Sequence, residues 1–237
     1  MPIYKIKLLH RKEVAEKTVV FTFEKPAEFI FTPGQYAGFT LIHPPETDAG
    51  GNTRRFSLLS IPQDAHIRIV TRIQSSAFKR VLNTLPIGSE LKLVGPSGHF
   101  TLHENSHIPA VFIAGGIGIA PFYSMIRHAT YQHSTQELSL FYGNAQETHA
   151  AFLEEFSQLE KQNPKFKCIL TMEHAHAHWK GHVGFITDAL ITKYLSSLTT
   201  PIYYICGSPA MVAALQTTLL KMGIDPHQMH AEDFPGY

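Results

Sequence analysis

The sequence predicts two domains, an antiparallel β-barrel over residues 1–103 and an α/β domain with a doubly wound parallel sheet over residues 104–237. Residues 1–102 read as short strands separated by turns that contain proline and glycine. From Ile108 onward, short apolar runs alternate with segments of helical periodicity, which is typical of a parallel sheet covered by helices. The chain has 237 residues, of which 44% are hydrophobic, so each domain can bury a core.

The strand segments of the first domain are rich in β-branched and aromatic residues. Residues 18–26 read TVVFTFEKP and residues 67–73 read IRIVTRI, with stretches of period-two alternation. One helix interrupts the strands, because the apolar residues of segment 77–85 (AFKRVLNTL) recur at helical spacing. Ser75 or Ser76 is expected to cap this helix.

The second domain alternates strand segments with helical segments. The strands are expected at residues 109–116, 138–144, 165–173 and 201–208. The helices are expected at residues 120–131, 148–162, 186–197 and 209–223. Doubly wound sheets bind their ligands at the carboxyl ends of the strands, so we expect a site at that edge.

Charge, cysteine content and hydropathy exclude several classes of protein. The net charge of +1 argues against a nucleic-acid partner. Two cysteines are too few for a disulfide framework or for an iron–sulfur cluster, which usually needs four thiolates. Residues 1–23 carry charges throughout, unlike a signal peptide, and no apolar run reaches the roughly 18 residues that predict a membrane span. We therefore expect a cytoplasmic protein without a membrane partner.

Two strand-to-helix turns of the second domain contain glycine. Residues 115–121 read GGIGIAP, where glycines let the backbone approach a pyrophosphate and Pro121 suits the first helical turn. Residues 206–211 read CGSPAM, with Ser208 as a natural N-cap and Cys206 on the same edge of the sheet. The alternatives are a turn with no ligand and a cysteine that serves only as a small buried hydrophobe.

A second candidate site lies in the first domain, at residues 52–60 (NTRRFSLLS). Arginines beside hydroxyls and an aromatic ring are costly in a barrel core unless they are paired. An anionic planar ligand would satisfy them: arginine would bind phosphate, Phe56 would pack along a ring system, and Ser57 would hydrogen-bond a ring heteroatom. The capped helix offers another anion site. The alternative is a solvated arginine pair on an edge strand.

Six motifs in this order resemble those of the ferredoxin–NADP reductase superfamily of flavin enzymes, and the resemblance covers nearly the whole chain. They are PGQY at 33–36, RRFS at 54–57, GPSGHF at 95–100, GGIGIAP at 115–121, CGSPAM at 206–211 and EDF at 232–234. The resemblance implies a first domain that binds a flavin, with FAD favoured over FMN, and a second domain that binds NADH or NADPH.

The resemblance also implies roles at single positions of the flavin domain. Arg54 would bind the flavin phosphates, Phe56 would line one side of the isoalloxazine, and Ser57 would hydrogen-bond the flavin N5. Further flavin contacts are implied at Val70, Thr71, Arg72 and Ser76. Where the family usually has a glycine before this last serine, the chain has Ser75.

In the second domain, the resemblance implies nicotinamide contacts and catalytic groups. The nicotinamide contacts are Gly115, Gly116, Gly118, Pro121, Gly207 and Met211. Cys206 and Glu232 would lie near the nicotinamide C4 and act in catalysis with Ser57. Phe234 or Tyr237 would cover the other face of the flavin.

The function implied is transfer of hydride from nicotinamide to FAD, then of electrons to a separate carrier such as ferredoxin, flavodoxin or an oxygenase component. Two alternatives stay open: a flavin or ferric reductase with a small-molecule acceptor, and a non-catalytic electron-transfer or regulatory subunit. Many relatives have an arginine where this chain has Ala145, with Glu147 close by, which favours NADH. Lys180 or a histidine could still supply the cation that NADPH requires.

Alternating histidines at His174, His176 and His178, with His182 beyond, are the pattern most suggestive of a metal site. On an extended strand alternate residues share a face, and three imidazoles could hold a metal. We favour the alternative, a polar loop, and predict no metal.

Overall fold

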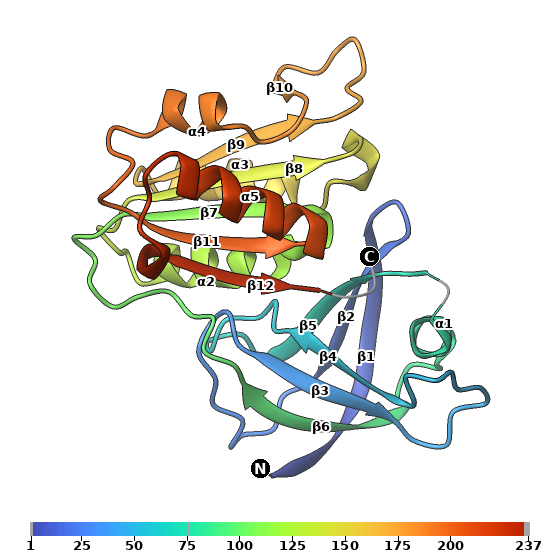
Figure 1. The fold of residues 1–237 in the computed structure, drawn as a ribbon. Coiled ribbons are helices and arrows are strands. Elements are labelled where there is room, and N and C mark those ends of the chain that lie inside the picture. Colours follow the sequence, from blue (N-terminus) through green and yellow to red (C-terminus); the bar gives the residue numbers. More distant parts are fainter. Residues whose placement is uncertain (1, 75, 235–237) are drawn as a thin grey trace.

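The computed structural model describes residues 2–74 and 76–234. Its N-terminal part is a sheet of six antiparallel strands in the order β4-β3-β6-β1-β2-β5 (Figure 1). The strands are β1 (Ile3–Ala15), β2 (Thr18–Glu24), β3 (Tyr36–Leu41), β4 (Thr53–Ser57), β5 (His66–Arg72) and β6 (Glu90–Ser97), and α1 (Ala77–Thr84) lies between the last two. The edge strands β4 and β5 are also in contact, so the sheet curls into a barrel.

The C-terminal part is a sheet of six parallel strands in the order β10-β9-β8-β7-β11-β12. The strands are β7 (Ala110–Gly115), β8 (Leu138–Asn144), β9 (Phe166–Met172), β10 (His182–Val183), β11 (Ile202–Gly207) and β12 (Met229–Asp233). The helices are α2 (Ile119–Tyr131), α3 (Leu153–Gln162), α4 (Asp188–Tyr194) and α5 (Pro209–Lys221). The strand order reverses at β7, and this reversal is the switch point at which such sheets bind ligands.

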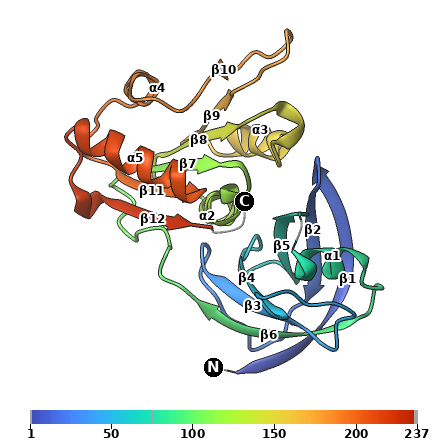
Figure 2. The same ribbon diagram turned by 45° about the vertical axis from the view of Figure 1, so that its right-hand side comes forward.

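Helices cover both faces of the parallel sheet (Figure 2). Phe122 of α2 packs in one apolar cluster with Phe112 of β7, while Leu215 of α5 packs in another with Tyr203 of β11. The barrel has a third apolar cluster of its own. These arrangements confirm the predicted fold class. The predicted domain boundary, at residues 103 and 104, falls between the end of β6 and the start of β7 and stays a prediction.

Four elements differ from the sequence expectation. The helix expected from residue 148 begins only at Leu153, because Phe152 takes a left-handed conformation with φ 66° and breaks the helical path. Thr187 caps α4, with its side chain accepting a hydrogen bond from the backbone N–H of Leu190, so this helix is shorter than expected. The edge strands β10 and β12 were not expected, and β10 lies where a polar loop was predicted. No helix in residues 2–74 and 76–234 is long and apolar enough to cross a membrane.

The barrel and the parallel sheet share an apolar cluster. Leu59, Val70 and Phe100 of the barrel part belong to the same buried cluster as Phe122 and Met125 of α2. Burying apolar surface on both sides of the junction stabilises one relative placement of the two parts. The site between them is therefore built on a fixed frame.

An ion pair joins the two parts beside this cluster. Both guanidinium nitrogens Nη1 and Nη2 of Arg127, on α2, donate to the carboxylate of Asp64, at 2.9 and 3.0 Å. Arg68 of β5 donates to the same carboxylate at 2.9 Å. Burial alone would raise the pKa of Asp64, but the hydrogen bond from Arg127 and the charges of Arg127 and Arg68 outweigh burial and lower this pKa to about 2.

We predict that Asp64→Asn lowers the free energy of unfolding at neutral pH by about 2 kcal/mol, because it leaves two arginines without their shared carboxylate. The contribution of Asp64 is present above the ordinary pKa of 3.8 and is lost as the pH falls through about 2. Urea unfolding measured across that range tests this. The control is Glu90→Gln, which removes an exposed pair with Lys5 and should change stability by less than about 0.5 kcal/mol. Equal effects of the two variants would contradict the prediction.

Candidate functional site

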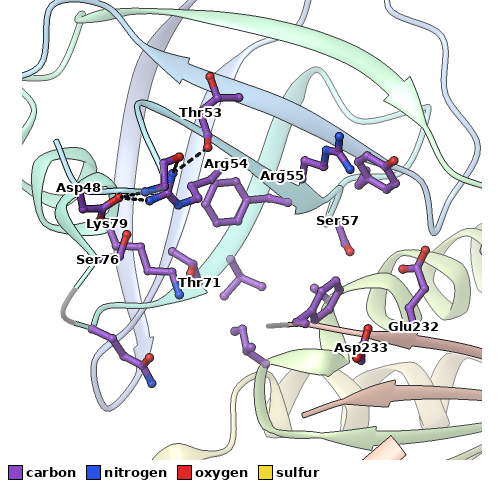
Figure 3. Close-up of a pocket in the computed structure, with 18 of the residues that line it drawn as sticks. Asp48, Thr53, Arg54, Arg55, Ser57, Thr71, Ser76, Lys79, Glu232 and Asp233 are labelled. Atoms are coloured by element: carbon purple, nitrogen blue, oxygen red, sulfur yellow. Dashed lines mark hydrogen bonds and ion pairs between the residues drawn. The ribbon is translucent and has the colours of Figure 1, made fainter. Parts of the chain in front are cut away.

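A pocket of about 1040 Å³ lies between the barrel and the parallel sheet (Figure 3). The barrel contributes residues of β4, β5 and α1, and the parallel sheet contributes β12 and the turn before α2. Figure 3 shows Arg54, Lys79, Asp48 and the start of α1 at one end, and Arg55, Ser57, Glu232 and Asp233 at the other. We call the first the cationic end, because two cations and a helix N-terminus meet there, and the second the carboxylate end. The volume of the pocket suits a large cofactor.

The cationic end is built by Arg54, Lys79 and the N-terminus of α1. Arg54 lies on β4, and its guanidinium donates to a carboxylate oxygen of Asp48 at 2.6 Å and to the carbonyl of Gly51 at 3.0 Å. Burial and the charges of Arg54 and Arg72 lower the pKa of Lys79. Clustered cations are a site for a phosphate-bearing ligand.

The wall between the two ends is formed by predicted flavin contacts. Val70 and Thr71 line the pocket from β5 and are buried. Phe56 also lines it, but its ring packs mainly into the barrel core, 5.9 Å from the ring of Phe39 and 5.8 Å from that of Phe78. Phe56 therefore offers the ligand one edge of a well-packed cluster.

Ser57 stands at the other end of the pocket. Its side chain is only 4% exposed, and its hydroxyl has no hydrogen-bond partner within the described residues. A buried polar group without a partner is costly, and a ligand that accepts or donates a hydrogen bond would remove that cost. This hydroxyl is the clearest sign that the pocket is built for a ligand.

Glu232 and Cys206 lie side by side, because β12 pairs with β11 in a register that puts these two residues opposite each other. Burial raises the pKa of Glu232 to about 7. Burial, followed by the charges of Glu232 and Asp233, raises the pKa of the Cys206 thiol well above its usual range. Glu232 can therefore exchange a proton near neutral pH, whereas Cys206 stays a thiol.

A second pocket, of about 580 Å³, lies at the carboxyl edge of the parallel sheet. It is lined by the glycines at the end of β7, by Asn144, by Glu173 and by the start of α5. Arg72 reaches this pocket from the barrel and also donates to the backbone carbonyl of His149 at 3.4 Å. The pocket combines backbone turns, one arginine and one carboxylate, which suits a dinucleotide.

Two glycines keep the turns of this edge close together. A side chain at Gly115 would collide with the sulfur of Met211, and one at Gly118 would collide with the carbonyl of Cys206. The turn after β7 therefore packs directly against the turn after β11. Glycine at Gly118 serves this backbone contact, since Gly118 lines neither pocket.

The predicted site residues divide between these two pockets. Arg54, Phe56, Ser57, Val70, Thr71, Ser76, Glu232 and Phe234 line the first. Arg72, Gly115, Gly116 and Met211 line the second. Gly118, Pro121, Cys206 and Gly207 are buried and line neither pocket. Tyr237 falls outside the described residues, and so does Ser75. Ser76 occupies the N-cap position of α1 without a side-chain capping bond.

Sequence reasoning missed Asp48, Asp233 and Glu173. Asp48 lies in the loop between β3 and β4, where no periodicity indicates which side chain turns inward. Glu173 follows β9 directly, so its position at the carboxyl end of a strand was a usable signal. His174, His176 and His178 follow β9 as a loop, and within residues 2–74 and 76–234 no group of three His, Cys, Asp or Glu side chains could hold a metal ion.

Comparison with known proteins agrees with this geometry. Residues 112–217 match the family described as the oxidoreductase NAD-binding domain. The reductase component of the naphthalene 1,2-dioxygenase and salicylate 5-hydroxylase systems of a Ralstonia species is 31% identical over 212 residues, covering 89% of this chain and 62% of the relative. The propane 2-monooxygenase reductase component of Mycolicibacterium goodii is 29% identical, covering 89% and 61%. The chain thus spans about three fifths of these relatives.

Solved structures share the fold over nearly the full chain. The FAD/NAD-binding domain of a nitric oxide dioxygenase from Vibrio cholerae superposes with a TM-score of 0.83 at 20% identity, covering 97% of this chain and 98% of that one. A ferredoxin NADP⁺ reductase from Neisseria gonorrhoeae, with bound FAD and NADP, has a TM-score of 0.82 at 19% identity and covers 98% of each chain.

We predict that Glu232→Gln changes how stability depends on pH. The pKa of Glu232 is about 7 in the folded chain against an ordinary value of 4.5, so the folded chain loses stability as the pH rises through this interval. Relative to the wild type, the variant should gain about 2 kcal/mol of unfolding free energy between about pH 5 and about pH 8. Urea unfolding at both pH values measures this, with the exposed Glu28→Gln as control. Parallel curves for wild type and Glu232→Gln would refute the prediction.

Proposed function

We propose that the chain is a member of the ferredoxin–NADP reductase superfamily and, from this premise, a flavin-dependent NAD(P)H oxidoreductase that reduces a separate electron carrier. The observation that carries the proposal is the first pocket, with cations at one end and the partnerless hydroxyl of Ser57 at the other. This is the polarity of a flavin nucleotide, whose phosphates are anionic and whose ring carries hydrogen-bonding heteroatoms.

FAD fits the residues that are present. Arg54, Lys79 and the first N–H groups of α1 would hold its phosphates, Val70 and Thr71 would lie along its ring system, and the hydroxyl of Ser57 would hydrogen-bond the ring. Phe234 lines the same pocket, where its backbone N–H donates to the carbonyl of Gly207 at 3.1 Å. Its ring would cover the flavin until nicotinamide takes its place.

The second pocket would hold the nicotinamide nucleotide. Gly115 and Gly116 present backbone to its pyrophosphate, and Arg72 adds a cation from the barrel side. Glu173 is the only carboxylate among the described lining residues and would accept hydrogen bonds from the ribose hydroxyls, as an acidic residue does in NAD sites. Together with Ala145 in the same pocket, it supports NADH over NADPH.

A bound flavin supplies the redox chemistry, because it accepts two electrons from a nicotinamide and can release them one at a time. The residues of the chain orient the flavin ring and hold or release protons. Ser57 fixes the ring by its hydrogen bond, and Glu232, with a pKa of about 7, holds or releases a proton at its carboxyl oxygen near neutral pH. Cys206, opposite Glu232 on the neighbouring strand, stays a neutral thiol.

The carrier is proposed to be a small electron-transfer protein: a ferredoxin, a flavodoxin or an oxygenase component. Relatives named as reductase components of oxygenase systems support this class of acceptor. Turnover with candidate carriers, compared with ferric chelates and free flavin, separates a protein acceptor from a small molecule.

The first experiment is a visible spectrum of the purified chain with FAD, followed by anaerobic titration with NADH and, separately, NADPH. We expect a flavin band that bleaches more readily with NADH. Ser57→Ala should slow bleaching about ten- to a hundredfold while retaining the flavin, because one hydrogen bond to the reacting ring is lost. Ser139→Ala, on β8 outside both pockets, is the control. Absence of a flavin band would refute the proposed function.

Glu173 tests the nucleotide preference. Glu173→Thr should raise the ratio of kcat/KM for NADPH to that for NADH about tenfold, because a 2′-phosphate no longer meets a carboxylate. Glu147→Gln is the matched control, since Glu147 lies near the same edge but accepts from the backbone N–H of His176 at 3.4 Å and lines neither pocket. If the ratio of kcat/KM values changes more in Glu147→Gln than in Glu173→Thr, then Glu147 and not Glu173 sets the nucleotide preference.

A further inference from the structure

Asp48 occupies the cationic end of the first pocket. One carboxylate oxygen accepts from the Arg54 guanidinium at 2.6 Å and from the backbone N–H of Gly50 at 2.9 Å. The other accepts from the backbone N–H of Ala77, the first residue of α1, at 2.8 Å. Asp48 therefore takes one N–H of the helix N-terminus and one of Arg54, which are the donors that a phosphate would use.

The surroundings of Asp48 are those of an anion site. Lys79 lines the same end of the pocket, and the buried Ser76 hydroxyl, at the N-cap of α1, has no hydrogen-bond partner in the described structure. At the other end of the same pocket, the Ser57 hydroxyl is also without a hydrogen-bond partner in the described structure, and only 4% of the residue is exposed. The hydrogen bond from Arg54, followed by that from Ala77, lowers the pKa of Asp48, so it is an anion at neutral pH.

The loop that carries Asp48 closes around Arg54. The guanidinium donates to the carbonyls of Gly50, Gly51 and Thr53 at 2.5, 3.0 and 2.9 Å. A side chain at Gly50 would collide with this guanidinium, so glycine there permits the closure. The exposed fraction of the Asp48 side chain is 34%, so the carboxylate can turn out of the pocket toward solvent.

We propose, on the basis of the flavin function above, that Asp48 is a built-in occupant of the flavin-phosphate subsite, which a phosphorylated flavin must displace to bind. Two anions cannot share the α1 N-terminus and Arg54 without repulsion, so each flavin phosphate competes with this carboxylate. Asp48 thereby sets how tightly the chain retains FAD or FMN. Riboflavin has no phosphate and does not compete.

The test compares wild type with Asp48→Asn in equilibrium titrations of FAD, FMN and riboflavin, followed by flavin fluorescence. Asparagine keeps the size of the side chain and an oxygen for the Ala77 N–H, but removes the charge. We expect the Kd for FAD and for FMN to fall about tenfold, as loss of one charge-assisted competitor implies, and the Kd for riboflavin to stay unchanged.

Glu46→Gln is the matched control. Glu46 lies in the same loop and pairs with Arg80 on the same helix, with its two oxygens 3.0 and 2.7 Å from the Nε and Nη2 atoms of Arg80, but it does not line the pocket. Glu46→Gln makes the same change of charge as Asp48→Asn. Because Glu46 does not line the pocket, this variant should leave all three Kd values unchanged. Thermal unfolding of each variant verifies that it is folded, and Asp48→Ala replaces Asp48→Asn if the latter is not.

The outcomes separate this inference from the proposed function. If Asp48→Asn weakens FAD binding, the carboxylate positions Arg54 for the phosphate and the inference is overturned. Equal changes for riboflavin and FAD overturn it too, because a general loosening of the loop would explain them. Unchanged FAD binding in a chain that takes up flavin overturns this inference alone. A folded chain that binds none of the three flavins overturns the proposed function, and this inference with it.

Discussion

The apolar contact between the barrel and helix α2 is the constraint on which the rest of the molecule depends. Val70 and Phe100 on one side and Phe122 and Met125 on the other belong to one buried cluster, and Asp64 ties the same junction to Arg127. Each half folds around its own core, but neither half contains a complete pocket. Only their fixed placement brings β4 and β5 of the barrel opposite β12 of the parallel sheet.

Charge is divided between the ends of the first pocket in a way that matches its proposed ligand. Arg54 and Lys79 gather where α1 begins, with Asp48 between Arg54 and the helix, while Glu232 and Asp233 lie where the two sheets meet. The pKa of Lys79 is lowered at the cationic end, and the pKa of Glu232 is raised at the carboxylate end. The second pocket adjoins the carboxylate end through the turn after β7, whose Ile117 lines the first pocket and whose Gly116 lines the second.

Sequence reasoning located the features that are encoded locally. The turn at Gly115 follows a short apolar run, and the segment that carries Arg54 and Ser57 places charged and hydroxyl groups beside an apolar run, so each contains residues with one clear physical use. It could not locate Asp48, because a polar loop carries no periodic signal, or β12, because five residues reading MHAED lack a strand pattern. The assignment of Arg72 to the second pocket depends on how the two halves are placed, which no local pattern encodes.

The position of β12 has a consequence for the order in which the molecule assembles. Among the described strands, β12 is paired with β11 alone, and it carries Glu232 into the pocket. A ribosome makes the chain from its N-terminus, and domains generally form as they emerge. The barrel, which carries the cationic end of the pocket, can therefore fold before β12 adds Glu232. The two ends of one pocket are thus made at different times during synthesis of the chain.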